Sequence, residues 1–411
     1  MATLRTFAAT ALTIAGLLSA ATAATAATPA NAAMTHALSA DGMPGGGQAE
    51  HQRQNGHEQE HCSHAFDRRL DAAVRHTLRV ANIPGVIVGF WEPGHCDYVR
   101  ALGDANTKTD ADMKTTLRMR IGSETKTFTA TAVLELVDDH KVGLDDPISQ
   151  YVSGVPDGNH ITLRQLAAMR SGLFPYTSDP DFINALQADP LKPYTPEQLL
   201  AFGFKHPNVF PPGTATQYSN TNYILLGLVV EKVSHMSLAD FLRKRVIDPS
   251  GLGHTLFPFG AEFPKPHAHG YTNQTPTGQI TDATDWNTSW AWAAGAMISD
   301  LRDLKHWARD VATGTLLTPE TQAERTTFLP TPIPSLSYGL GLFNVNGWIG
   351  HDGSIPGYQS LTVYLPKQHA TLVVLVNTDV SYQGLAPTTL FGKAITSIVS
   401  PHHIYDIPAM P

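Results

Sequence analysis

A serine and a lysine three positions apart, Ser123 and Lys126, are the residues of this sequence whose types and spacing most directly suggest chemistry. A serine hydroxyl is a weak nucleophile until an adjacent base takes its proton. Residues three apart on a helix share a face, and burial lowers the pKa of a lysine so that it can act as that base. The mostly apolar segment 128–137 predicts a buried helix, whose first free N–H groups would stabilise an oxyanion. Taken alone, the same spacing also fits an exposed helical turn.

A tyrosine and an asparagine two positions apart, Tyr218 and Asn220, form a second candidate group. The phenol can relay a proton to a leaving group, and the amide can orient substrate and lysine. Tyr271 has the same spacing to an asparagine, but it lies in a loop rich in Pro, His and Gly. A predicted helix over 223–233 follows Tyr218 and would hold it rigidly, so we favour Tyr218 as the functional tyrosine.

A histidine followed two positions later by a glycine, His351 and Gly353, forms the third group, and no other histidine has this spacing. Glycine in a strand lets the backbone approach a ligand closely. The N–H of the next residue, Ser354, would then be a second oxyanion donor beside that of Ser123. The motif lies just before the predicted terminal strands. A lone histidine with this spacing also fits an ordinary turn.

The elements that must position these groups follow from hydrophobic periodicity. Apolar residues recur every four positions from Phe66 to Leu78, which predicts a helix. Apolar runs bounded by turn signals predict strands at 85–91, 98–102, 361–365 and 372–376. Further helices are predicted at 162–169, 223–233, 301–311 and 386–399. Strands at both ends with helices between them predict a mixed α/β fold with one sheet built from both chain ends.

The N-terminal segment has the order of a secretory signal peptide. Arg5 precedes an apolar run over 7–20, and small residues with A-x-A sites follow. We therefore expect residues 1–32 to be removed and the protein to be secreted, extracellular and without a stable membrane anchor. An uncleaved anchor is the alternative, but the run is barely long enough to span a bilayer.

The remaining chain is expected to comprise a flexible polar leader over 33–64 and one catalytic domain over 65–411, with a mainly helical insertion at roughly 125–290. The leader contains His57 and His61 in an H-E-x-x-H pattern, which is typical of zinc sites. No apolar face flanks this pattern, so we expect a chance match. The sequence therefore predicts no metal and no cofactor.

Composition bounds the remaining possibilities. Among 411 residues, 42% are hydrophobic, which excludes global disorder, and the net charge of −8 argues against nucleic acid as a partner. The two cysteines, Cys62 and Cys96, exclude a four-cysteine zinc site. In the expected oxidising compartment they can form a disulfide, although two unrelated thiols are the alternative.

In their order and spacing, the three groups together resemble the serine penicillin-recognising family, which includes secreted actinobacterial D-alanyl-D-alanine carboxypeptidases and class C β-lactamases. Similar stretches surround them: Arg120-Ile121-Gly122, Leu144-Asp145-Asp146-Pro147, Arg170-Ser171-Gly172-Leu173 and Tyr338-Gly339-Leu340-Gly341. The resemblance extends from about residue 65 to the C-terminus. It implies a β-lactamase/DD-peptidase-like antiparallel sheet with flanking helices, an inserted helical subdomain and the site between them.

The resemblance also implies roles for the candidate residues. Ser123 would attack a carbonyl carbon and form an acyl-enzyme, while Lys126, aided by Tyr218, takes its proton. Tyr218 would then protonate the leaving amine and later help to activate water. Asn220 would hold the substrate amide.

His351 is where this sequence departs from the commonest family pattern, in which many relatives have lysine. The resemblance places Gly353 and Ser354 at the oxyanion site next to it. An imidazole is only partly charged near neutral pH, so recognition of a substrate carboxylate should depend less on this position. This substitution makes an efficient β-lactamase a weaker prediction.

We therefore predict a monomeric, secreted serine D-alanyl-D-alanine carboxypeptidase that acts on peptidoglycan peptides in the cell-wall space. It would bind D-Ala-D-Ala-terminated peptides or β-lactams. A β-lactamase, or an esterase or D-aminopeptidase of the same family, is the first alternative. A non-catalytic penicillin-fold protein that binds the wall or acts as a sensor is the second.

Overall fold

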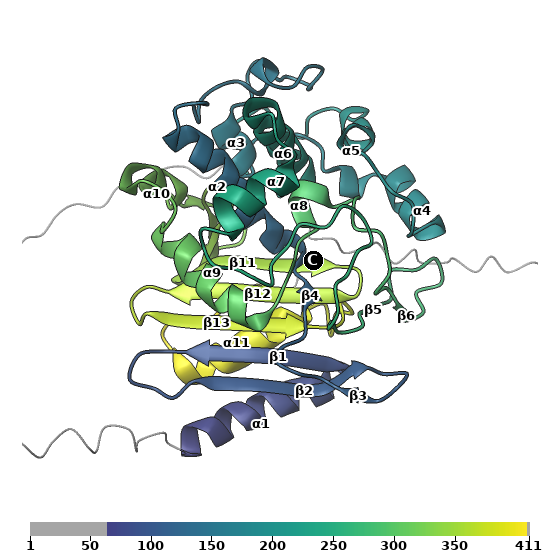
Figure 1. Cartoon of the computed structure of the whole chain (residues 1–411), viewed down its shortest axis with the longest axis vertical. Coiled ribbons are helices and arrows are strands. Elements are labelled where there is room, and N and C mark those ends of the chain that lie inside the picture. The colour runs from purple at the N-terminus through teal and green to yellow at the C-terminus, as the bar shows by residue number, and fades with distance from the viewer. Residues whose placement is uncertain (1–63, 409–411) are drawn as a thin grey trace, which may run out of the picture.

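Nine strands form one antiparallel sheet in the computed structural model of this chain, which describes residues 64–408. The strand order is β3-β2-β1-β13-β12-β11-β10-β9-β8. The N-terminal strands are β1 (Gly85–Trp91), β2 (Tyr98–Asn106) and β3 (Ala111–Asp112). The C-terminal strands are β8 (Leu329–Pro330), β9 (Leu336–Tyr338), β10 (Phe343–Val345), β11 (Trp348–Ile355), β12 (Tyr358–Leu365) and β13 (Ala370–Val376). Because β1 pairs with β13, the predicted sheet from both chain ends is confirmed (Figure 1).

The middle of the sheet is buried on both faces, which explains its unbroken apolar strands. Every residue of β1, β12 and β13 is buried. The helix α11 (Pro387–Val399) packs on β12 and β13 and against α1 (His64–Val80). The helix α9 (Leu301–Thr313) packs on the same strands from the front in the view of Figure 1. These helices cover apolar area that would otherwise face water.

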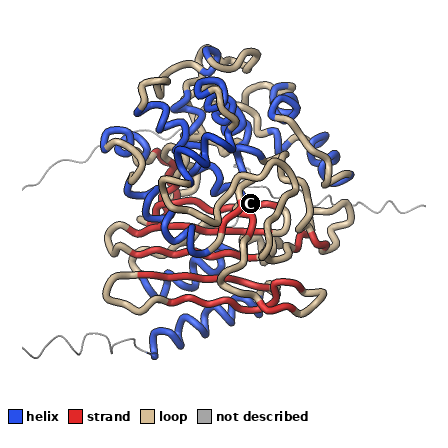
Figure 2. The backbone as a smooth tube through the Cα atoms, in the orientation of Figure 1, coloured by secondary structure: helices blue, strands red, loops and turns tan. Residues whose placement is uncertain are grey.

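The connection between the two strand groups is mainly helical and gathers at one end of the sheet, as Figure 2 shows. Its helices are α2 (Thr125–Asp138), α3 (Leu163–Ala167), α4 (Pro180–Ala188), α5 (Pro196–Phe204), α6 (Asn220–Ser234), α7 (Leu238–Leu242), α8 (Trp292–Gly295) and α10 (Pro319–Arg325). Short turns of other helix types are Gly122–Glu124, Ile148–Gln150, Tyr176–Ser178 and Arg243–Ile247. Two small ladders pair β4 (Met119–Arg120) with β7 (Ile298–Ser299) and β5 (Tyr271–Thr272) with β6 (Thr281–Asp282).

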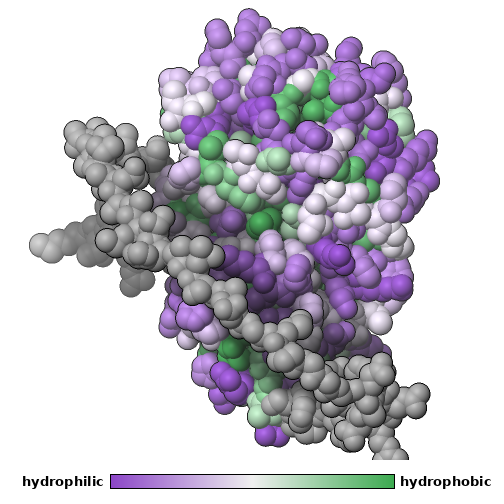
Figure 3. Space-filling view, turned by 90° about the vertical axis from the view of Figure 1, so that its left-hand side faces the viewer, coloured by the Kyte–Doolittle hydropathy of each residue, from purple (hydrophilic) through white to green (hydrophobic). Residues whose placement is uncertain are grey.

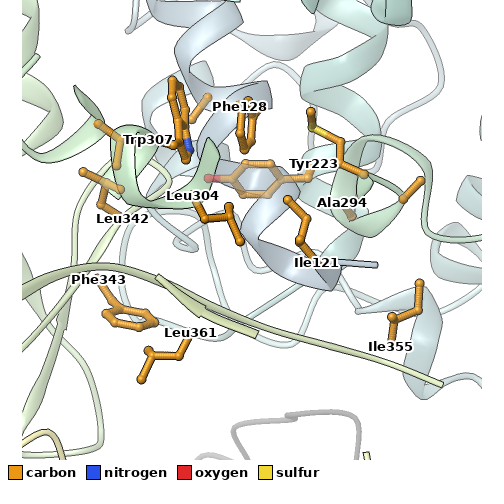
Figure 4. Packing of buried hydrophobic residues seen from close by; sticks show 14 of the residues in the cluster. Ile121, Phe128, Tyr223, Ala294, Leu304, Trp307, Leu342, Phe343, Ile355 and Leu361 are labelled. Carbon is orange, nitrogen blue, oxygen red and sulfur yellow. The ribbon is translucent and has the colours of Figure 1, made fainter. Parts of the chain in front are cut away.

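The helix α2 lies at the centre of this helical part and is buried from Thr125 to Leu136. It packs against α6 and α8. Phe128 stacks on Trp307 of α9 (Figure 4), and their ring centroids are 4.1 Å apart. The Trp307 indole also donates a hydrogen bond to Thr127 Oγ1 at 2.7 Å. These contacts hold the start of α2 at the junction between helices and sheet.

Several sequence-based predictions concern segments beyond the described residues. The signal peptide, the leader up to residue 63, the H-E-x-x-H pattern and Cys62 all lie outside them. Cys96 is disulfide-bonded. Within residues 64–408, the structure contains no helix of the length and apolar character that crossing a membrane requires. Where coloured atoms are visible in Figure 3, this face of the molecule is mostly hydrophilic, with small hydrophobic patches.

Candidate active site

The side chains of Ser123 and Lys126 meet at the junction of the helical part and the sheet. Ser123 sits in the turn Gly122–Glu124, and Lys126 is in the first turn of α2. Lys126 Nζ lies 3.0 Å from Ser123 Oγ, and the lysine side chain is fully buried. The ammonium group also donates to Asn220 Oδ1 and to the Ala294 carbonyl, each at 2.7 Å. The structure therefore brings the first candidate group and Asn220 into one hydrogen-bonded cluster.

Burial gives Lys126 the properties of a base. Desolvation holds the pKa of Lys126 well below its ordinary value, and the negative charge of Asp352 acts in the opposite direction. A neutral amine has two N–H bonds and one lone pair. Asn220 Oδ1 and the Ala294 carbonyl only accept hydrogen bonds, so they take both N–H groups. The lone pair of the neutral form then faces the Ser123 hydroxyl, whose proton it can remove.

Tyr218 covers this cluster from the cavity side. Its ring centroid lies 4.7 Å from Lys126 Nζ, and its buried hydroxyl has no hydrogen-bond partner among the described residues. Burial raises the pKa of Tyr218 well above its ordinary value, and the neighbouring Ser123 hydroxyl opposes that shift. Tyr218 is therefore a neutral phenol that can give a proton. Tyr271 is elsewhere: its hydroxyl accepts from the backbone of Thr107 at 2.8 Å.

Asn220, the first residue of α6, is held at both ends of its amide. Its oxygen accepts from Lys126, and its nitrogen donates to Thr177 Oγ1 at 3.2 Å. The sequence suggested that Asn220 orients both lysine and substrate. In this structure its partners are protein groups, so the geometry places it as the residue that orients Lys126.

His351 precedes β12 and β13, as predicted, and lies within β11, a strand that begins at Trp348 and was not predicted. The imidazole is 2% exposed and its Nδ1 lies 2.5 Å from the Asp352 carbonyl. A carbonyl only accepts, so Nδ1 carries a proton, and Nε2 lies 2.9 Å from the Tyr338 hydroxyl. His351 thus supports the cavity wall through Tyr338, while its ring packs beside Tyr218 with centroids 6.2 Å apart.

Gly353 lines the cavity and provides a close approach between β11 and the segment that carries Ser123. A Cβ atom on Gly353 would lie 1.9 Å from the Ile121 carbonyl oxygen. Gly122 has φ of +51°, and a Cβ on it would lie 2.7 Å from Ser354 N. The two glycines therefore let β11 run against the turn that carries Ser123. This contact explains why the Ser354 backbone lies beside Gly122, the residue before Ser123.

Sequence reasoning missed a buried acid directly after the candidate nucleophile. The Glu124 side chain is 1% exposed, and neither carboxyl oxygen has a hydrogen-bond partner in the described part of the chain. Burial raises the pKa of Glu124 to about 8, although the nearby hydroxyls of Ser360 and Thr362 oppose the shift. Glu124 is therefore mostly neutral at pH 7. Its burial depends on β12, so no local signal in the sequence could reveal it.

Ser123 opens into a cavity of about 230 Å³ between the sheet and the helical part. Apolar and aromatic groups form much of its wall, including Tyr176, Trp290, Ile333, Leu336, Phe343 and Leu385. Two carboxylates, Asp352 and Asp379, also line it. Among residues 64–408, no lysine or arginine belongs to this lining. The cavity is therefore apolar with acidic points on its wall.

A separate group of possible metal ligands, His254, Asp300 and Asp303, lies elsewhere in the described structure. His254 Nδ1 is 2.5 Å from Asp300 Oδ2, and Asp300 caps the start of α9. Asp303 accepts from the His254 backbone at 2.7 Å and from Thr255 Oγ1 at 2.8 Å. Hydrogen bonds within the fold therefore explain why the carboxylates of Asp300 and Asp303 lie together, without a metal ion.

Comparison with known proteins gives consistent matches across the described chain. The family model described as Beta-lactamase matches residues 70–391. The structure is similar to that of a D-stereospecific amidohydrolase from Streptomyces sp., with 31% sequence identity, a TM-score of 0.72, and 82% of this chain and 98% of that one covered. It is also similar to the D-amino acid amidase from Ochrobactrum anthropi SV3, with 26% identity, a TM-score of 0.71, and 82% and 97% covered.

Among curated proteins, the chain is similar to Protein flp of Staphylococcus aureus (strain MRSA252), with 26% identity over 334 residues. The match covers 76% of this chain and 63% of flp. The chain thus spans less than two thirds of the length of this relative.

Proposed function

Because the chain belongs to the beta-lactamase family of serine hydrolases, we propose that it hydrolyses amides of D-amino acids through an acyl-enzyme on Ser123. The observation that carries this proposal is the buried Lys126 amine, 3.0 Å from Ser123 Oγ and held by two acceptors that leave its lone pair for the serine. Similarity to a D-stereospecific amidohydrolase and a D-amino acid amidase supports the choice of substrate class.

The first half of the reaction transfers the acyl group to the enzyme. Lys126 takes the proton of Ser123, and Oγ forms a bond to the amide carbonyl carbon. The backbone N–H groups of Ser123 and Ser354 stabilise the oxyanion that develops. Tyr218 donates its proton to the leaving nitrogen, and the Lys126 ammonium beside its ring returns a proton to it. The C–N bond breaks, and the amine departs.

The second half releases the acid. A water molecule enters where the amine left, and Tyr218, with Lys126 behind it, takes up a water proton. The resulting hydroxide attacks the ester carbonyl, and the proton returns to Ser123 Oγ as the ester bond breaks. Asn220 keeps Lys126 in place through both halves. The products are a D-amino acid and an amine or ammonia.

The charges of the cavity support this substrate class over the carboxypeptidase predicted from the sequence. A peptide ending in D-Ala-D-Ala carries a carboxylate close to the bond that is cut. Asp352 and Asp379 line the cavity, and no described lysine or arginine does so. Like charges repel in a site of low dielectric constant. A D-alanyl-D-alanine carboxypeptidase is therefore the alternative activity, and a comparison of substrates distinguishes it from the amidase.

The test offers purified protein D-phenylalaninamide, L-phenylalaninamide, an N-acyl-D-Ala-D-Ala peptide, a chromogenic cephalosporin and a p-nitrophenyl ester. We expect the D-amide to have the highest kcat/KM and the L-amide to react poorly. Fastest release of D-Ala would instead support the carboxypeptidase, and efficient cephalosporin turnover would support a β-lactamase. Ser123→Ala should abolish every reaction. No turnover of any substrate by the wild type would contradict the proposal and favour a binding or sensor protein.

We also propose that the protein is exported and works outside the cell as a monomer without a cofactor. The predicted signal peptide over residues 1–32 is the support for export. N-terminal sequencing of the protein recovered from culture medium would reveal cleavage, and retention of the full-length chain in the cells would contradict it.

A further inference from the structure

One carboxylate on the cavity wall accepts no hydrogen bond from the residues that the structure describes. The Asp352 side chain is 37% exposed and lines the cavity. Its nearest cationic or imidazole neighbour is His351, whose Nδ1 is 3.5 Å from Asp352 Oδ1. That nitrogen already lies 2.5 Å from the Asp352 carbonyl. In the part of the chain that the structure describes, no hydrogen bond reaches the Asp352 carboxylate.

The second carboxylate of the cavity is different. Asp379 is 7% exposed, and it accepts hydrogen bonds from Gly357 N at 3.0 Å, from Thr272 Oγ1 at 3.1 Å and from the Gln274 amide. These bonds tie three chain segments together, so Asp379 has a structural role. Asp352 alone keeps acceptor capacity for a bound molecule. An unpaired carboxylate in a partly buried wall gains most from a cationic donor.

Asp352 is also at the right distance from the reacting carbonyl. Along β11, the buried Gly353 separates Asp352 from the exposed Ser354, and both Asp352 and Ser354 line the cavity. Two residues of an antiparallel strand span about 6.8 Å. The Ser354 backbone lies beside the turn of Ser123. In an amino acid amide, a single carbon separates the α-ammonium from the carbonyl carbon. With the carbonyl oxygen at Ser354 N–H, the ammonium can reach the carboxylate two residues earlier.

We propose that Asp352 is a specificity-determining residue that binds the α-ammonium group of D-aminoacyl substrates. This inference rests on the proposed amidase function and adds to it that the substrate has a free amino group. N-acylated amides lack the positive charge and lose the charge-assisted hydrogen bond. The same carboxylate repels substrates with a carboxylate near the cut bond.

The competing role for Asp352 is to orient His351. Such a role would affect all substrates alike, because the imidazole supports the cavity wall whatever is bound. An ammonium-binding role affects only substrates that carry the ammonium. The ratio of kcat/KM for D-phenylalaninamide to that for N-acetyl-D-phenylalaninamide separates the two roles.

The experiment measures this ratio for the wild type, Asp352→Asn, Asp352→Ser and Asp352→Glu. We expect the wild type to favour the free amine at least tenfold. The Asn and Ser variants should lower the ratio at least tenfold, mainly through KM for the free amine, and Glu should restore part of it. Asp97→Asn is the control, since Asp97 is 65% exposed, pairs with Lys305 and does not line the cavity.

A ratio that stays unchanged in both the Asn and Ser variants would overturn the inference, as would an equal loss on the two substrates. If the wild type cleaves both D-amides with equal kcat/KM, the amidase function stands and only the role of Asp352 fails. If it cleaves neither D-amide, the proposed function fails, and this inference fails with it.

Discussion

Gly353 of β11 is in backbone contact with Ile121, the residue before the turn Gly122–Glu124 that carries Ser123. A Cβ on Gly353 would lie 1.9 Å from the Ile121 carbonyl oxygen. This contact sets the distance between the sheet and Ser123. It also brings the N–H group of Ser354 to the place where an oxyanion would form. The proposed oxyanion site therefore depends on Gly353, because the backbone of Ile121 fills the space that a side chain at this position would need.

Gly353→Ala should accordingly lower both stability and activity. The strand or the turn must move to admit the methyl group, and overpacking of this kind costs about 1–3 kcal/mol. Misplacing an oxyanion donor by about 1 Å lowers the rate by roughly 100-fold. Thermal unfolding and kcat on the favoured substrate measure the two effects. Gly253→Ala is the matched control, because a Cβ there meets no atom within 4 Å. Near-normal kcat in Gly353→Ala would contradict this account.

Lys126→Met should remove the base while filling most of the lysine volume. We expect acylation of a p-nitrophenyl ester to slow by about 10²- to 10⁴-fold, the usual contribution of a general base. The variant also leaves Asn220 Oδ1 and the Ala294 carbonyl without their buried donor, which costs about 1–3 kcal/mol for each acceptor. Single-turnover kinetics measure the acylation rate, and chemical unfolding measures the loss of stability. Acylation at the normal rate would show that Lys126 is not the base that takes the Ser123 proton.

The pH dependence of kcat/KM should report the protonation of Lys126. Burial holds its pKa well below the ordinary value, and the Asp352 charge raises it. Activity needs the neutral amine, so it falls as the pH drops through this pKa. Replacing Asp352 with Asn removes the charge that favours the ammonium form. The acidic limb should therefore move to lower pH, measured with N-acetyl-D-phenylalaninamide so that substrate ammonium plays no part. A move to higher pH would contradict the assignment.

Glu124→Gln should make stability less dependent on pH. The ordinary pKa of a glutamate is 4.5, and burial raises that of Glu124 to about 8 in the folded state. Between these values the unfolded chain has lost the proton while the folded chain keeps it, so the wild type loses stability as the pH rises. The full loss above pH 8 is on the order of a few kcal/mol.

The Gln variant carries no proton to lose, so its free energy of unfolding should change less than that of the wild type between pH 5 and about 8. Chemical unfolding at these two pH values tests this. An equal decrease in both proteins would show that other groups cause the pH dependence.

Much of the fold was predictable because hydrophobic periodicity is local. The predicted strand at 85–91 has the same bounds as β1, and the predicted helix at 386–399 differs from α11 by one residue. The predicted strand at 98–102 is shorter than β2, which continues to Asn106 through half-buried residues with no clear alternation. The strand β11, which contains His351, was not predicted, because polar residues there face the cavity and break the apolar pattern.

By itself, the sequence indicated the sheet built from both chain ends, four of its strands, and the three groups that converge on one site. Spacing and periodicity depend on neighbouring residues, so they can be seen without a structure. Only the tertiary structure decided that Lys126 is a buried amine with acceptors 94 and 168 positions away, and that Glu124 is buried. It also decided that the Asp352 carboxylate lines the cavity 3.5 Å from His351 and without a hydrogen bond from the described residues. Desolvation and charge depend on which distant segments pack together, and these set what each side chain can do.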